Sequence, residues 1–364
     1  MPEPSDLVLR RCRRLDEAGL VDIAVRDGHV ECIGRGLSGG RQEVDLGGAF
    51  VSAAWVDCHA HVASEVTPGR IDPLTYGPAQ GVGALIDAGS APPRRMGELL
   101  ATRPWVYALA NVDSRGIRGE GLQPEISGAA ADEALGRYPG RVVGLKVQAS
   151  QSVLGELAPK AIENAIKVAE RHGVPVMVHV GNPPPALEVV CDLLRAGDVI
   201  THYAHGKPEG ATLADGRPLP ALRRAYERGV LLDVGHGRSS FSFRRFRQLL
   251  EAGIRPSTIS TDLHASSARS PVVSLARTMS KLIELGLPPV EALDKVTAAP
   301  ARAFALQGYG ELKEGGPASL TAFVLEEREV MTEDSLGEML ACKLWVRPIG
   351  CLAGGEWFEA TTPP

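Results

Sequence analysis

The fold of this chain is indicated by the stretch Ala53-Ala54-Trp55-Val56-Asp57-Cys58-His59-Ala60-His61, in which an apolar run ends in polar residues. Alternate residues of a β-strand point to the same side, so His59 and His61 would present two imidazoles on one face. Such a pair suits a metal ion. Taken alone, it is equally consistent with two surface histidines in a loop.

The same pattern recurs along the middle of the chain. Short apolar runs end at His59, Asp87, Asn111, Lys146, His179, His202, Gly235 and Asp262. Successive members of this series are 23 to 35 residues apart. A βα unit takes about 30 residues, and eight units in about 250 residues describe a closed parallel barrel. The sequence therefore predicts an α/β fold, a (β/α)8 TIM barrel over residues 51–307, with these polar residues at the end where active sites lie.

Amphipathic stretches separate the apolar runs. Pro159–His172 carries apolar residues on one helical face and ends before Gly173, and Val174–Val178 then reads as a buried strand. This alternation of helix and strand is what a parallel barrel requires.

Both ends of the chain read differently. Residues 1–50 and 308–364 contain short strand-like runs, with tight turns indicated by Asp27-Gly28 and Gly354-Gly355. We expect the two ends to meet in one small β-sandwich domain beside the barrel.

The bulk composition excludes several classes of protein. The chain has 364 residues, 44% hydrophobic and 23% charged, with a net charge of -5, and no basic stripe predicts a nucleic-acid partner. No run approaches the roughly 20 apolar residues that span a bilayer, and Met1–Leu9 lacks the pattern of a secretory signal. The six cysteines form no Cys-x-x-Cys pair, so we expect reduced thiols and a cytoplasmic location. A homo-oligomer stays open.

Three of the closing residues extend the possible metal site. His179 and His202 close consecutive runs, and Asp262 closes the last one. A single histidine at a strand end is often a core residue, and Asp262 could cap a helix, but all of them together favour a shared metal. A carboxylate there can bind metal and take a proton from a metal-bound water whose pKa is about 7.

Lys146 is the unexpected member of the set. A buried ammonium beside metal cations is unfavourable. The lysine is therefore neutral, salt-bridged, or converted by CO2 to an anionic carbamate that could bridge two metals.

These residues, in this order, resemble the amidohydrolase superfamily with a binuclear metal centre, and most closely its amidohydrolase/deacetylase branch, often labelled dihydroorotase-like. The resemblance rests on Asp57–His61, Gly144–Lys146, Ser150–Gly155, His179–Pro184, Gly197–His202, Asp233–Gly237 and Ile259–His264. One departure is Gln148, where a basic residue is expected.

The resemblance implies a role for each ligand. His59 and His61 would hold one metal with Asp262, His179 and His202 would hold the second, and carboxylated Lys146 would bridge them. The cofactors implied are two divalent ions, with zinc expected. Asp262 would act as general base and then as acid to the leaving group.

Residues that could meet a substrate are predicted from their positions after the strands. Arg115 and Arg238 could pair with a carboxylate, and His236 could either touch substrate or support another residue. Asn182, Tyr203 and His264 could line the mouth. We expect His205 and His172 on the surface and His29 in the β domain.

The sequence thus predicts a hydrolase that cleaves an amide or ester bond of a small acylated carboxylic acid by metal-bound hydroxide. A cyclic amide hydrolase of the dihydroorotase or hydantoinase type is the alternative. A non-catalytic barrel scaffold would predict broken ligands, and all six are present.

Overall fold

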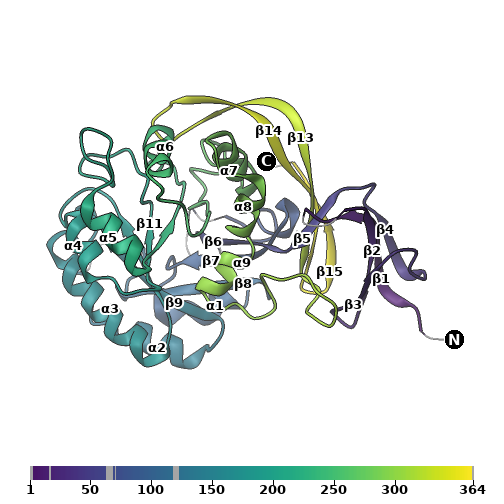
Figure 1. Cartoon of the computed structure of the whole chain (residues 1–364). Coiled ribbons are helices and arrows are strands. Elements are labelled where there is room, and N and C mark those ends of the chain that lie inside the picture. The colour runs from purple at the N-terminus through teal and green to yellow at the C-terminus, as the bar shows by residue number, and fades with distance from the viewer. Residues whose placement is uncertain (1–2, 16–17, 63–68, 70, 118–122, 363–364) are drawn as a thin grey trace.

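The computed structural model describes residues 3–15, 18–62, 69, 71–117 and 123–362. These residues form two sheets, a seven-stranded sheet surrounded by helices and an eight-stranded sheet to one side (Figure 1). No helix of the described residues is long and apolar enough to cross a membrane.

Consecutive strands are neighbours in the seven-stranded sheet, and all of their pairings are parallel. The strands are β6 (Trp55–Ala60), β7 (Val82–Ala88), β8 (Val106–Asn111), β9 (Val142–Ala149), β10 (Val176–Val180), β11 (Val199–Thr201) and β12 (Leu231–Asp233). Parallel strands joined by helices place their carboxyl ends at one edge, so His59, Lys146 and His179 come to the same side.

Helices follow the strands, as the alternation predicts. The α-helices described are α1 (Met96–Leu100), α2 (Ala129–Arg137), α3 (Ala158–His172), α4 (Leu187–Leu193), α5 (Pro220–Arg228), α6 (Phe243–Glu251), α7 (Leu275–Glu284), α8 (Pro289–Asp294) and α9 (Ala298–Ala303). Short 3-10 turns are η1 (Pro78–Gln80), η2 (Pro93–Arg95) and η3 (Gly155–Leu157). The predicted helix at 159–172 is confirmed by α3, which buries one face of alanines and branched residues.

The segment 258–263 lies between the two edges of the parallel sheet. Thr258 forms a parallel bridge with Asp233 of β12, and Leu263 forms one with Ala60 of β6. The N–H of Val234 donates to the Thr258 carbonyl at 3.1 Å, and the N–H of His61 donates to the Leu263 carbonyl at 2.9 Å. This segment is bonded to both edges without the regular ladder of a strand, and it carries Asp262 into the same ring of residues.

The second sheet contains both ends of the chain, as expected. Its order is β15-β14-β13-β5-β1-β2-β3, with β4 also paired to β1. The strands are β1 (Ser5–Arg13), β2 (Leu20–Arg26), β3 (His29–Gly34), β4 (Gly40–Asp45), β5 (Phe50–Ala53), β13 (Leu320–Glu333), β14 (Met339–Ala353) and β15 (Glu356–Glu359). Antiparallel pairs on either side of Asp27-Gly28 and Gly354-Gly355 confirm both turns. The sandwich form and the domain boundaries stay predictions.

The β13–β14 hairpin is much longer than the sequence suggests. The sequence predicts short strand-like runs near 319–325, 344–348 and 350–358, whereas the pairing of β13 with β14 continues to Glu333 and Met339. The outer half, 326–332, is polar and largely exposed, so it shows no apolar alternation. Its support is tertiary, because β14 packs on α7 and the hairpin arches over that helix (Figure 1).

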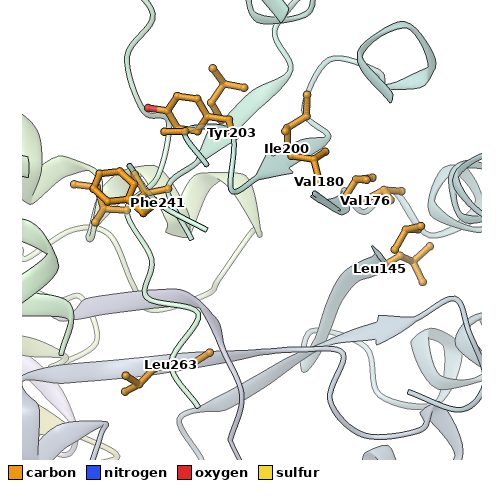
Figure 2. Packing of buried hydrophobic residues seen from close by; sticks show 14 of the residues in the cluster. Leu145, Val176, Val180, Ile200, Tyr203, Phe241 and Leu263 are labelled. Atoms are coloured by element: carbon orange, nitrogen blue, oxygen red, sulfur yellow. The ribbon is translucent and has the colours of Figure 1, made fainter. Parts of the chain in front are cut away.

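Three apolar clusters hold the two sheets. The largest joins the strands of the parallel sheet to the surrounding helices. Figure 2 shows Leu145, Val176, Val180 and Ile200 along neighbouring strands of this sheet, and Tyr203 and Phe241 belong to the same cluster. A second cluster fills the small sheet. A third contains Met177 and Phe304, and because Met177 Sδ lies 3.3 Å from Lys146 Nζ, it forms an apolar floor beneath that lysine.

Phe323 joins the two sheets and gives a test of this packing. Its buried ring lies 5.7 Å from that of Phe50 and 5.4 Å from that of Trp55. We expect Phe323→Ala to lower the free energy of unfolding by about 3–5 kcal/mol, measured by urea denaturation. Met339→Ala on the same hairpin, with Met339 56% exposed, should change it by no more than about 0.5 kcal/mol. Equal effects of the two variants would contradict this packing.

Candidate metal centre

Two histidines and an aspartate form the centre of the site. His59, His61 and Asp262 each offer a ligand atom, and these atoms lie within 4.8 Å of one another. Asp262 Oδ1 lies 2.8 Å from His61 Nε2 and 3.4 Å from His59 Nε2. The chain brings them together because His59 lies near the end of β6 and His61 follows directly after it, beside the 258–263 segment.

The other three predicted ligands adjoin this group. Lys146 Nζ lies 3.2 Å from His59 Nε2, and His202 Nε2 lies 3.9 Å from Asp262 Oδ2. The His179 and His202 rings are 4.4 Å apart. The structure therefore assembles in one place all six residues that the sequence singles out.

The second ring nitrogen of three histidines is already engaged. The Nδ1 atom of His61 lies 2.8 Å from Ser90 Oγ, that of His59 2.9 Å from Thr201 Oγ1, and that of His202 2.6 Å from the Gly235 carbonyl. Each ring thus turns its Nε2 atom toward the centre. His202 Nε2 is fully buried without a hydrogen-bond partner in the described structure. A buried nitrogen of this kind fits a metal ligand.

Two buried carboxylates that the sequence reasoning did not assign support the ligands from below. The hydroxyls of Thr201, Thr258 and Ser260 all donate to Asp233, so Thr201 links Asp233 to His59. The Thr261 hydroxyl and N–H both donate to Asp57, which fixes the residue before Asp262. Both aspartates lie in motifs that carry the resemblance, but their partners lie elsewhere, in β11 and in the 258–263 segment.

Burial sets the charge of the site. It lowers the pKa of His202 to about 3 and, with neighbouring Lys146, holds that of His59 well below its usual range. Burial also lowers the pKa of Lys146 to about 8. Burial by itself would raise the pKa of Asp262, but the adjacent histidines lower this pKa more strongly, to well below its usual value. The site thus offers neutral imidazoles, an anionic carboxylate and a readily neutralised amine, which is a donor set for divalent metal.

The backbone is strained at two of the predicted ligands. His202 and Asp262 have φ angles of 69° and 50°, in the left-handed region. Such conformations cost of order 1–3 kcal/mol and tend to occur at functional sites. Gly235 allows the close approach to His202, since a Cβ there would lie 2.7 Å from its Nδ1.

Two of the predicted substrate residues are buried. His236 is inaccessible, and its Nε2 lies 2.9 Å from Lys281 Nζ. This favours the supporting role for His236 over direct contact with substrate. Tyr203 packs in the main core cluster, and its hydroxyl has no partner among the described residues.

The other predicted substrate residues are more accessible. Asn182 is exposed, and the His264 ring lies 6.2 Å from that of His61. Arg115 is held in an ion pair with Asp113 at 2.5 Å. Arg238 is exposed and lines a cavity of about 580 Å³ beside the hairpin. Contact of any of them with substrate stays a prediction.

One expectation about the surface is wrong, and one residue was missed. His205 is buried rather than exposed, because its loop turns back and the N–H of Lys207 donates to its Nδ1 at 3.2 Å. Lys207 itself is half-buried, and its ammonium has no partner among the described residues. Burial lowers its pKa while Asp262 opposes this, and its charge helps lower the pKa of His179. A lysine five residues after His202 carries no motif that would reveal it.

Comparison with known proteins identifies this arrangement. The amidohydrolase family matches residues 122–338, which include four of the six groups at the centre, all except His59 and His61. The chain belongs to the amidohydrolase family. This amidohydrolase is accordingly a metal-dependent hydrolase of amide bonds.

Relatives match nearly the whole chain. The amidohydrolase is 32% identical to a protein named deacetylase from Enterococcus faecalis, over 93% of this chain and 95% of that one. It is 34% identical to deacetylase Atu3266 of Agrobacterium fabrum, over 92% of this chain and 86% of that one. A solved structure titled an adenine deaminase has a TM-score of 0.92 at 31% identity, covering 98% of this chain and 100% of its own. One titled a dihydroorotase has a TM-score of 0.89 at 31% identity, covering 98% and 99%.

The neutral buried histidines make the stability of the metal-free protein depend on pH. An unfolded histidine takes up a proton near pH 6.5, whereas folded His202 does not until about pH 3. Stability is therefore fully present above pH 6.5 and falls below it, by up to about 2 kcal/mol per histidine at pH 5. Chelator-treated protein unfolded in urea at pH 7 and 5 should show this loss.

His202→Gln provides the matched comparison. This variant should lose less stability between pH 7 and 5 than the wild type, whereas exposed His29→Gln should lose as much. An undiminished loss in His202→Gln would show that burial does not keep this imidazole neutral.

Proposed function

We propose that this amidohydrolase is a deacetylase-type enzyme that removes an acyl group from a small carboxylic acid, at an amide or ester bond. The observation that carries the proposal is the convergence of six donor groups around Asp262. The deacetylase-named relatives that match nearly the whole chain support the choice of acyl substrate.

We also propose the finer architecture. The 258–263 segment, bonded to β12 and β6, would be the eighth strand of a closed (β/α)8 barrel. Fully buried Lys146, whose pKa falls to about 8, is open to reaction with CO2. Its carbamate would bridge two divalent ions, with zinc expected, since nitrogen ligands and carboxylate suit it. His59, His61 and Asp262 would hold one ion, and His179 and His202 the other.

When bound, these ions supply a hydroxide nucleophile at neutral pH and polarise the acyl carbonyl. Asp262 takes the proton at a carboxylate oxygen and returns it to the leaving nitrogen or oxygen. Its side chain keeps 13% of its area exposed, so it can reach both groups. The apolar floor beneath Lys146 excludes water, and this strengthens the electrostatic interactions between the charged groups of the site.

Positive charge at the mouth supports a carboxylate on the substrate. Lys207 lacks a partner among the described residues, and the charge of Asp262 acts on it. Arg238 bonds to the Ser266 carbonyl at 3.2 Å and has donors to spare. A small anionic substrate would offset these charges. All six cysteines are free, which supports the proposed cytoplasmic location, and a homo-oligomer remains a proposal.

A cyclic amide hydrolase is the second proposal. The dihydroorotase-titled structure with a TM-score of 0.89 favours it, and the same metal centre would serve ring opening. The two proposals differ in what occupies the mouth, an acyl group or a planar ring.

A substrate panel separates these proposals. Zinc-loaded enzyme should hydrolyse acetylated hydroxy acids or amino acids, and should turn over dihydroorotate, hydantoin and adenine slowly or not at all. Lys207→Met should lower kcat/KM for the anionic substrate about 10- to 100-fold, since a charge-assisted hydrogen bond contributes about 1.5–3 kcal/mol, and should spare the matching methyl ester. Absence of turnover on every acyl compound would overturn the leading proposal.

Asp262→Asn tests the proton-transfer role. The amide cannot accept the proton, so kcat should fall by about 10²- to 10⁴-fold, with the circular dichroism spectrum unchanged. Asp215→Asn, at an exposed residue paired with Arg217, should retain full activity. Wild-type turnover by Asp262→Asn would assign the proton to another group.

A further inference from the structure

The far end of the β13–β14 hairpin, residues 334–338, is here called the hairpin tip. Asp334 is 2% exposed, and its carboxylate accepts from the N–H groups of Leu336 at 2.7 Å and Glu338 at 2.9 Å. The same carboxylate accepts from the N–H of Phe243, the first residue of α6, at 3.0 Å. The tip is thus a closed turn fastened to the start of a barrel helix, across about 90 residues of sequence (Figure 1).

Ser335 extends this contact into the loop before α6. Its N–H donates to the Phe241 carbonyl at 3.1 Å, and its Oγ accepts from the Phe241 N–H at 3.2 Å. The Ser335 hydroxyl donates its own proton to the Gly237 carbonyl at 2.9 Å. One side chain of the C-terminal hairpin therefore holds two points of the loop that follows β12.

The same loop is held from another side by α7. Lys281 is fully buried, and its Nζ donates to His236 Nε2 at 2.9 Å and to the Pro271 carbonyl at 2.7 Å. The His236 ring packs on Phe241, with ring centroids 4.7 Å apart. His236 and Gly237 are thus gripped between a helix of the barrel and the hairpin tip.

Gly237 connects this turn to Asp262. Its N–H donates to the Thr261 carbonyl at 2.9 Å, and its φ is +57°. A Cβ on Gly237 would lie 2.5 Å from Asp262 Oδ2, so the backbone of this glycine is packed directly against the carboxylate. Any outward movement of the turn would free that carboxylate to rotate away from the histidines.

We propose that the hairpin tip positions Asp262, with Ser335 and Lys281 holding the His236–Gly237 turn against its carboxylate. Neither residue touches substrate; both act through Gly237. The C-terminal hairpin is in this way part of the active site, although it begins and ends in the other sheet. The inference rests on the proton-transfer role that the proposed function gives Asp262.

Ser335→Ala is the direct test, because it removes one hydroxyl from a turn that keeps its Asp334 bonds. A lost hydrogen bond predicts a fall in kcat of about three- to tenfold, with KM little changed. Ser335→Thr restores the hydroxyl and should recover kcat. Met339→Ala, a 56% exposed position on the same hairpin, should match the wild type.

Lys281→Met provides a second variant, which keeps the length of the side chain and removes its bond to His236. It should lower kcat in the same way. A fall in thermal stability with kcat unchanged in both variants would reduce the contacts to structural support and overturn the proposal.

Two measurements need no substrate and so separate this inference from the proposed function. Amide hydrogen exchange over 236–243 should be faster in Ser335→Ala than in Met339→Ala. Crystal structures of wild type and Ser335→Ala should differ in the torsion of the Asp262 side chain. Unchanged exchange or an unmoved carboxylate would overturn the inference, whereas a wild type inactive on all acyl compounds would overturn only the proposed function.

Discussion

The structure depends on one carboxylate that is largely buried, with 13% of its side chain exposed. Asp262 lies within 4 Å of nitrogen atoms of His59, His61 and His202, and the charge of Lys146 acts on the same group of residues. A buried charge is costly unless its partners are fixed. The hydrogen bonds around the site fix the positions of those partners.

These hydrogen bonds extend beyond the residues that face the centre. Hydroxyls on neighbouring strands connect His59 to Asp233, and Thr261 connects the Asp262 segment to Asp57. These aspartates are themselves buried, and burial raises the pKa of Asp57 to about 7. Polar networks of this kind are worth most when every member is satisfied, and here the network includes the last residue of each of two short strands, Thr201 of β11 and Asp233 of β12.

The sequence predicts the parts of this site that lie in local patterns. His59, Lys146, His179 and Asp262 each close an apolar run, so their strands and their common end follow from periodicity. Ser90, Lys207 and Ser335 do not close an apolar run. Their positions depend on loops whose conformation is set by tertiary contacts. The outer half of the hairpin was not predicted for the same reason, because it is supported by α7 and has no apolar face of its own to indicate a strand.

The long hairpin has a consequence for how the protein is made. The loop that packs against Asp262 ends near residue 243, but the residues that hold it are 334 and 335. A ribosome must therefore add about 90 more residues, and release them from its exit tunnel, before the site can reach its final form. The pairing of β5 with β13 imposes the same order on the second sheet. During synthesis the strands of the parallel sheet can therefore pair before residues 334 and 335 arrive to complete the support of the Asp262 carboxylate.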